Sequence, residues 1–133
     1  MLCLLLSGCS RFDGQRNKEA IFSYVESNRE LLLSCICQED YTPLRGRFSP
    51  EDIDVEENHV DFDWRATGFG SETAYCGFFW SESGNLYAAW CAPPAEEALM
   101  PRDDGFFWQE TEGDNTYYVE EICDNFFYYK GTF

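Results

Sequence analysis

Runs of three or four adjacent aromatic residues recur three times in the second half of this chain, and this pattern constrains the fold most. The runs are Phe78-Phe79-Trp80, Phe106-Phe107-Trp108 and Phe126-Phe127-Tyr128-Tyr129. Of the 24 aromatic residues (12 Phe, 8 Tyr and 4 Trp), 19 follow residue 59, where short alternating segments favour β-structure. Neighbouring side chains of a strand point to opposite faces. The runs therefore predict a sheet with large aromatic side chains on both faces, and each face needs a cover.

Turn-forming residues divide this aromatic region into short segments at hairpin spacing. Glu82-Ser83-Gly84-Asn85, Glu112-Gly113-Asp114-Asn115 and Asp124-Asn125 each separate two such segments, as β-hairpin loops do. Between residues 68 and 71 two glycines predict a bulge or tight bend. Successive hairpins favour an antiparallel meander, in which each strand pairs with the next. The predicted strands are residues 53–55, 60–65, 74–81, 86–91, 106–111, 116–122 and 126–130.

Ahead of the strands, the chain has helical periodicity. Ile21, Val25 and Leu32 belong to an apolar stripe with spacings of three and four residues, which is typical of one face of a helix. No Gly or Pro interrupts this segment before Pro43. The spacing predicts one helix over residues 17–38 that covers a face of the sheet. The expected fold class is α+β, with one long N-terminal helix packed on a curved antiparallel meander sheet.

A single helix shields only one face, so the second face is where a ligand could bind. Either connector residues 41–48 cover that face, or it is a docking surface. Exposed aromatic rings flanked by carboxylates can stack on sugar rings or grip an extended peptide. The candidate ligand-binding aromatic residues are Trp80 and Trp108.

The first ten residues, MLCLLLSGCS, combine a short apolar segment with Leu6-Ser7-Gly8-Cys9. This segment resembles the lipobox of bacterial lipoproteins, and the whole chain resembles small lipoproteins of Gram-positive bacteria. The resemblance implies that Cys9 receives a diacylglyceryl group and becomes the first mature residue. It implies a signal peptide at residues 1–8, truncated at its start because it has no positive charge. A tether at residues 9–16 and a single α+β domain at residues 17–133 follow, and we expect a lipid-anchored, extracytoplasmic protein on the cell membrane.

The charge balance excludes several classes of partner. Nine Lys and Arg residues against 25 Asp and Glu residues give a formal net charge of −16. Binding to nucleic acid or to anionic lipid through a basic face needs the opposite balance. One His in the chain argues against His-based triads and multi-His metal sites. We expect no cofactor, no metal and no nucleic-acid partner.

Besides Cys9, the predicted mature chain contains an odd number of cysteines, so they cannot all pair with one another. They are Cys35, Cys37, Cys76, Cys91 and Cys123. Three interpretations stay open: small buried apolar side chains, one disulfide with free thiols left over, or a metal site.

Two pairs of carboxylates are spaced so that each pair lies on one face of a strand. They are Asp52 with Asp54, and Asp61 with Asp63. In so acidic a chain we expect both pairs on a solvated outer face. Calcium binding, or a division into general acid and base when the two are unequally buried, are the alternatives.

These features favour a membrane-anchored extracytoplasmic binding or interaction module without enzymatic activity. Its expected partner is a cell-wall glycan or a surface protein. One alternative is a glycan hydrolase that uses a carboxylate pair, and another is a structural accessory of a surface complex. A deep cleft with two buried carboxylates would favour the hydrolase, and an exposed aromatic face would favour the binding module.

Overall fold

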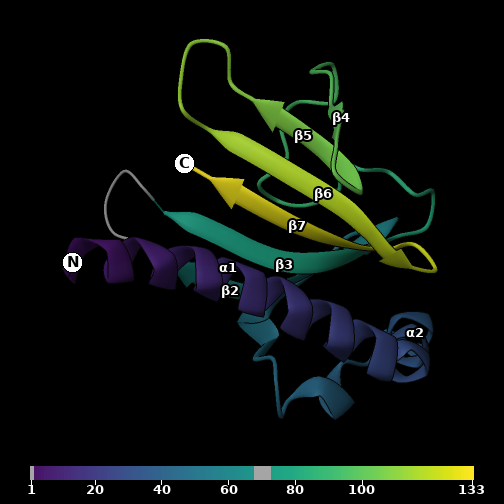
Figure 1. Cartoon of the computed structure of the whole chain (residues 1–133). Coiled ribbons are helices and arrows are strands. Elements are labelled where there is room, and N and C mark those ends of the chain that lie inside the picture. Colours follow the sequence, from purple (N-terminus) through teal and green to yellow (C-terminus); the bar gives the residue numbers. More distant parts are fainter. Residues whose placement is uncertain (1, 68–72) are drawn as a thin grey trace.

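A computed structural model describes residues 2–67 and 73–133, with residues 2–13 and 67 described by their backbone alone. The bend predicted for residues 68–71 lies outside the described residues. Within the described part, two α-helices precede a 7-stranded antiparallel sheet, which confirms the α+β class (Figure 1). The helices are α1 (Leu2–Ser27) and α2 (Arg29–Gln38), followed by 3-10 turns at Thr42–Leu44 and Pro50–Asp52. The strands are β1 (Ile53–Val55), β2 (His59–Thr67), β3 (Ala74–Ser81), β4 (Met100–Arg102), β5 (Gly105–Gln109), β6 (Thr116–Cys123) and β7 (Phe126–Thr132).

The sheet is two meanders joined through its last strand, and so the prediction of one simple meander was wrong. The strand order is β1-β2-β3-β7-β6-β5-β4. β7 pairs antiparallel with β3 on one side and with β6 on the other. Hairpin turns fix the neighbours within each meander, but no turn signal encodes the pairing of β3 with β7. The edge strands β1 and β4 are each three residues long, which limits pairing with other chains.

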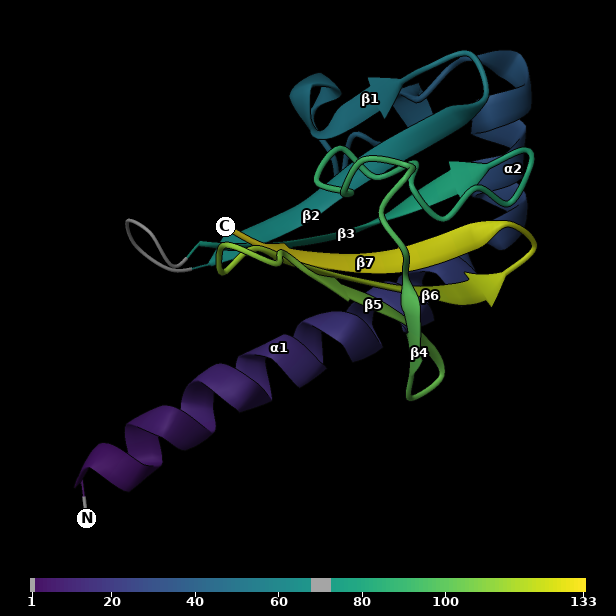
Figure 2. The same ribbon diagram turned by 90° about the horizontal axis from the view of Figure 1, so that it is seen from above.

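The segment between β3 and β4 is not the predicted strand over residues 86–91 but an irregular crossover. Gly84 has φ +74°, and the Asn85 carboxamide accepts a hydrogen bond from the Tyr87 backbone N–H at 3.0 Å. This local turn directs the chain away from hairpin pairing with β3. We call residues 82–99 the strap, because they cross the sheet face opposite the helices (Figure 2).

The predicted single helix is two helices that meet at Asn28. The backbone of Asn28 leaves helical geometry at φ −117° and ψ 17°. Its side-chain amide donates a 2.8 Å hydrogen bond to the Tyr24 carbonyl, which also accepts the backbone N–H of Asn28. An Asn side chain that competes for backbone partners in this way disfavours a continuous helix. The apolar stripe is nevertheless as predicted, since Ile21, Val25 and Leu32 are fully buried.

Strand alternation divides the aromatic runs between two cores, as predicted. On the helix side, Phe62, Phe78 and Phe126 pack beneath α1 and α2. Phe79, Phe127 and Tyr129 point to the other side and pack beneath the strap. The predicted cover from residues 41–48 was wrong, because Leu44 and Phe48 belong to the helix-side core. The second face is covered chiefly by the strap.

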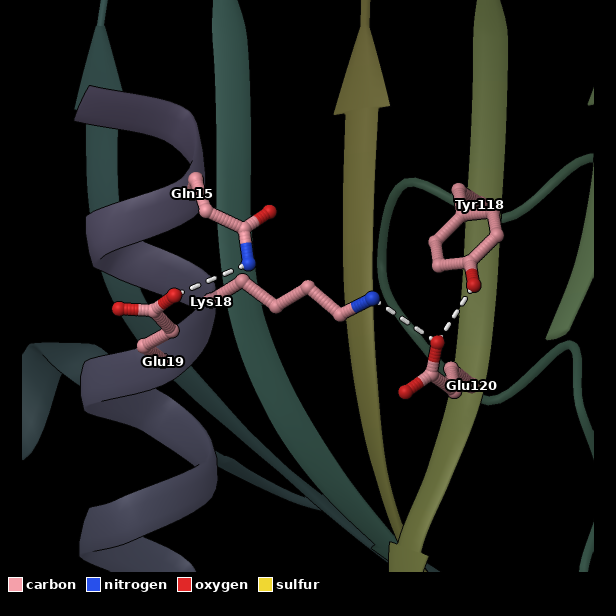
Figure 3. A network of polar contacts seen from close by, with 5 residues as sticks. All are labelled: Gln15, Lys18, Glu19, Tyr118 and Glu120. Carbon is pink, nitrogen blue, oxygen red and sulfur yellow. Dashed lines mark hydrogen bonds and ion pairs between the residues drawn. The ribbon is translucent and has the colours of Figure 1, made fainter. Parts of the chain in front are cut away.

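A partly buried ion pair fastens α1 to the sheet. The Lys18 Nζ atom lies 2.9 Å from Glu120 Oε1 on β6, and the Tyr118 hydroxyl donates a 2.6 Å hydrogen bond to the same oxygen (Figure 3). The Lys18 ammonium also lies over the rings of Phe22, Tyr118 and Tyr128, which adds cation–π attraction. Toward its N-terminus, α1 extends past the sheet in both views (Figures 1 and 2).

Candidate functional site

The strap is held by few polar bonds and by small side chains. Ala88, Ala89 and Cys91 are its fully covered residues in the strap-side core. The Tyr117 hydroxyl donates a 2.8 Å hydrogen bond to the Leu86 carbonyl. Leu86, Ala92 and Leu99 of the strap also pack against this core, partly buried, so apolar contacts and polar bonds together attach the strap to the sheet.

An open groove of about 580 Å³ lies between the strap and the hairpin that joins β5 to β6. Its lining combines apolar rings with carboxylates, and none of its described lining residues is Lys or Arg. We call it the acidic groove. Its principal lining residues are Pro93, Pro94, Glu97, Trp108, Glu110, Glu112 and Phe133.

Trp108 lies in the acidic groove, as a ligand-binding role would require. The residue is half-buried on the strap side of β5. Its indole Nε1–H points to Glu97 Oε2 at 3.4 Å, and the Tyr87 hydroxyl donates to the Glu97 carbonyl at 2.6 Å. The strap therefore places a glutamate at the edge of the Trp108 ring.

The structure does not bring the two candidate tryptophans together. Trp80 lies on the helix side of β3, packed against the helix-side core, whereas Trp108 lies on the strap side of β5. The two aromatic runs look alike in sequence, but their strands present the third residue to opposite faces. Trp108 alone belongs to the candidate site.

Three aromatic residues beside the acidic groove were missed by the sequence analysis. Tyr75, Trp90 and Phe133 contact one another, with ring centroids 4.8 to 5.9 Å apart. Trp90 is 48% exposed and Phe133 is 38% exposed. Phe133 also lines the acidic groove, so the exposed aromatic surface continues from the groove to Trp90. None of the three stands in an aromatic run, and so the pattern that found Trp108 gave no signal for them.

The carboxylates Asp61 and Asp63 share one tyrosine hydroxyl. Asp61 is only 2% exposed, which corrects the expectation that this pair lies on a solvated face, although Asp63 is exposed. The Tyr129 hydroxyl lies 2.8 Å from Asp61 Oδ1 and 2.9 Å from Asp63 Oδ1. Trp90 of the strap donates its backbone N–H to Asp61 Oδ2 at 2.8 Å and its indole N–H to Asp63 Oδ1 at 2.9 Å. The strap is thus bonded to both carboxylates.

Burial raises the pKa of Asp61 to about 7, against the hydrogen bonds from Trp90 and Tyr129, which lower it. The neighbouring charge of Asp63 raises this pKa further. Burial also raises the pKa of the Tyr129 hydroxyl and of the Cys91 thiol, so both keep their protons. Gly77 makes the arrangement sterically feasible, because a Cβ at this position would lie 2.7 Å from the Tyr129 hydroxyl.

The other predicted carboxylate pair does not form a site. Asp52 closes a capping box, in which its Oδ2 accepts hydrogen bonds from the backbone N–H and hydroxyl of Ser49. Asp54 is exposed on β1, opposite Asp61 in the strand register. In the described part of the chain, no three His, Cys, Asp or Glu residues are grouped to hold a metal ion, and the five described cysteines are free thiols.

Two features distinguish this fold: the closing strand β7 lies at the centre of the sheet, and the strap covers one sheet face. The acidic groove and the Asp61–Tyr129–Asp63 cluster both depend on the strap. Comparison of the chain with protein-family models, curated proteins and solved structures gives no match.

Proposed function

We propose that the protein is a non-enzymatic binding module, anchored to the extracytoplasmic face of a membrane, and that the acidic groove holds its ligand. The observation that carries the proposal is the lining of this groove, where Trp108 and Phe133 stand among Glu97, Glu110 and Glu112. Rings of this kind stack on sugars or on apolar side chains. The carboxylates accept hydrogen bonds from sugar hydroxyls or bind the cations of a protein partner. A cell-wall glycan and a surface protein are therefore the proposed partners.

The membrane anchor is proposed from the sequence. Leu6-Ser7-Gly8-Cys9 resembles a lipobox, and these residues lie in the part of α1 described by its backbone alone. No helix among the described residues is both long and apolar enough to span a bilayer. A lipid on Cys9 would attach to the end of α1 that extends past the sheet (Figure 2).

The proposal that the groove binds a glycan is tested by measuring binding of the full chain to insoluble cell-wall glycan and to its soluble fragments. Trp108→Ala should raise the Kd about fivefold or more, as expected for a stacked aromatic anchor. Phe106→Ala is the matched control, since Phe106 is an exposed ring two positions before Trp108 on the same strand and does not line the groove. Equal binding by wild type and Trp108→Ala would contradict the proposed site.

The proposal that the groove binds a surface protein is tested with a photo-crosslinking amino acid placed at residue 112, which lines the groove. A surface protein crosslinked there, but not from residue 106, supports a protein ligand. A stable complex with a surface protein that does not contact the groove would instead support the alternative role, that of a structural accessory of a surface complex.

One observation favours a second function, that of a glycan hydrolase. Asp61 and Asp63 share a hydroxyl and differ in burial, which is how a general acid is separated from a base. However, Asp61 lies beneath the strap and outside the described lining of the acidic groove. Release of reducing ends from cell-wall glycan by wild type, lost in Asp61→Asn, would establish this alternative over the binding module.

A further inference from the structure

The Tyr129 hydroxyl has two carboxylate neighbours but only one proton. It lies within hydrogen-bond distance of both Asp61 Oδ1 and Asp63 Oδ1, and it can donate to only one of them. The second contact is satisfied when a carboxyl group carries a proton and donates it to the tyrosine oxygen. Asp63 Oδ1 already accepts the indole N–H of Trp90. We therefore take ionised Asp63 as the group that accepts the proton of the Tyr129 hydroxyl in this row of hydrogen bonds.

Asp61 is the carboxyl group placed to hold the additional proton. Its Oδ2 accepts the backbone N–H of Trp90, which leaves Oδ1 facing the tyrosine oxygen. A protonated Asp61 donates to Tyr129, Tyr129 donates to Asp63, and Asp63 accepts Trp90, so that every polar group of the cluster is paired. Removal of the proton leaves two negative carboxylates on one hydroxyl, with the Asp61 charge out of contact with water.

The surroundings of Asp61 offer its negative charge little compensation. The titratable groups that face Asp61 come from its own strand β2, from β1, β6 and β7, and from the strap. The neighbouring strand β3 contributes the apolar ring of Phe79. The titratable groups are acids, hydroxyls and a thiol: Asp63, Asp54, Tyr117, Tyr129 and Cys91. The simplest relief for an ionised Asp61 is hydration, and the segment that keeps water out is the strap.

We propose that Asp61, Tyr129 and Asp63 form a proton-operated latch, which fastens Trp90 and the strap to the sheet in acid and loosens them toward neutral pH. The proton released on loosening goes to water. The strap supplies Pro93, Pro94 and Glu97 to the acidic groove, so the latch regulates the assembly of this groove. That consequence rests on the proposed function, whereas the latch itself depends only on the cluster.

The sign and the pH window follow from proton linkage. With the strap closed, the pKa of Asp61 is raised to about 7; with the strap open and the carboxyl hydrated, it returns to about 4. Between these values the closed form binds a proton that the open form lacks, so the opening equilibrium increases about tenfold per pH unit. Above pH 7 both forms are ionised and the dependence levels off.

Hydrogen exchange of the Trp90 backbone amide in the full chain tests the latch. Its protection factor, corrected for intrinsic exchange, should fall about tenfold per pH unit from pH 5 to 7 and then level off. Asp61→Asn, which imitates the protonated acid, should show protection that does not change with pH. Asp54→Asn is the matched control, because it removes a neighbouring carboxylate outside the hydrogen-bonded cluster and should keep the slope.

Two results would overturn the latch. One is protection of Trp90 in wild type that does not vary with pH, or that varies equally in Asp61→Asn. The other is exchange of the Trp90 amide only together with the central Phe78 amide, because the strap would then not open separately from the fold.

A second measurement does not depend on any variant folding. The ¹³C NMR shift of the Asp61 carboxyl carbon in wild type should titrate near neutral pH, and a midpoint near 4 would refute the latch. Both measurements need no ligand. If the protein binds neither glycan nor a surface protein, the proposed function is refuted but the latch is not. If the latch tests fail, the proposal that the groove binds a ligand is not affected.

Discussion

At the scale of single residues, the chemistry of Asp61 is decided by groups far from it in the sequence. Asp61 and Asp63 point to the same side of β2, yet Asp61 is buried and Asp63 is exposed. Trp90 from the strap and Tyr129 from β7 complete the environment of Asp61. A buried carboxyl group with hydrogen-bond partners on the strap and on β7 links protonation to folding as well as to local opening.

We expect the stability of the protein to fall as pH rises from about 4 to 7. Across this range the folded state binds a proton at Asp61, where the pKa is raised to about 7, and the unfolded state does not. The folded state therefore loses relative stability with rising pH, up to roughly 4 kcal/mol for a shift of about three pKa units. Urea denaturation at several pH values measures this change.

Comparison with Asp61→Asn isolates the contribution of this residue. The difference in unfolding free energy between wild type and variant should vary over pH 4 to 7 and be constant above pH 7. A difference that is the same at pH 4.5 and pH 7 would show that Asp61 titrates alike in both states.

The position of the Asp61–Asp63 pair was predictable from the sequence, but its burial was not. A spacing of two residues places both side chains on one face of a strand, as the structure has it. Burial required the strap, the Tyr129 hydroxyl and the space beside Gly77, which are contributed by segments distant in sequence. Sequence periodicity carries no information on such contacts.

At the scale of elements, local patterns identified most of the sheet and missed two places where a single polar side chain redirects the backbone. Six strands were predicted close to their observed bounds because alternation and turn residues are local signals. The break at Asn28 depends on one side-chain hydrogen bond. The strap contains a short run of apolar residues at 86–92, as a buried strand does, but its turn at Gly84 and Asn85 sends it across the sheet face.

The helix stripe allows a direct test with neighbouring leucines on α2. Leu32 is fully buried, whereas Leu31 is 40% exposed. Leu32→Ala should lower the unfolding free energy by about 2–5 kcal/mol, because it leaves a cavity against the sheet. Leu31→Ala, the matched control, should change it by about 0.5 kcal/mol or less. Equal losses in chemical denaturation would mean that α2 does not pack on the sheet through Leu32.

At the scale of the whole molecule, the proposed lipid anchor and the acidic groove belong to different parts of the chain. Cys9 lies on α1, and the groove is formed by the strap and the β5–β6 hairpin. Attachment and binding should therefore be separable by substitution.

The anchor is tested by labelling in a Gram-positive host with radioactive palmitate. Wild type, expressed behind a lipoprotein leader of the host, should incorporate the label and partition into detergent, and Cys9→Ala should do neither. Cys37→Ala, which removes an exposed thiol, should label as wild type does. Label retained in Cys9→Ala would refute the lipoprotein assignment.

The central position of β7 affects when this protein can fold. β3 and β6 both hydrogen-bond to β7, so each meander keeps an open inner edge until the chain has been synthesised past residue 126. The pairing of β3 with β7 joins segments far apart in sequence, and such contacts form late. The nascent chain before that point has no complete sheet. For a polypeptide proposed to act outside a membrane, a strand that joins two earlier meanders leaves the sheet incomplete until residues 126–132 have been made, which favours passage of the preceding strands in an extended form.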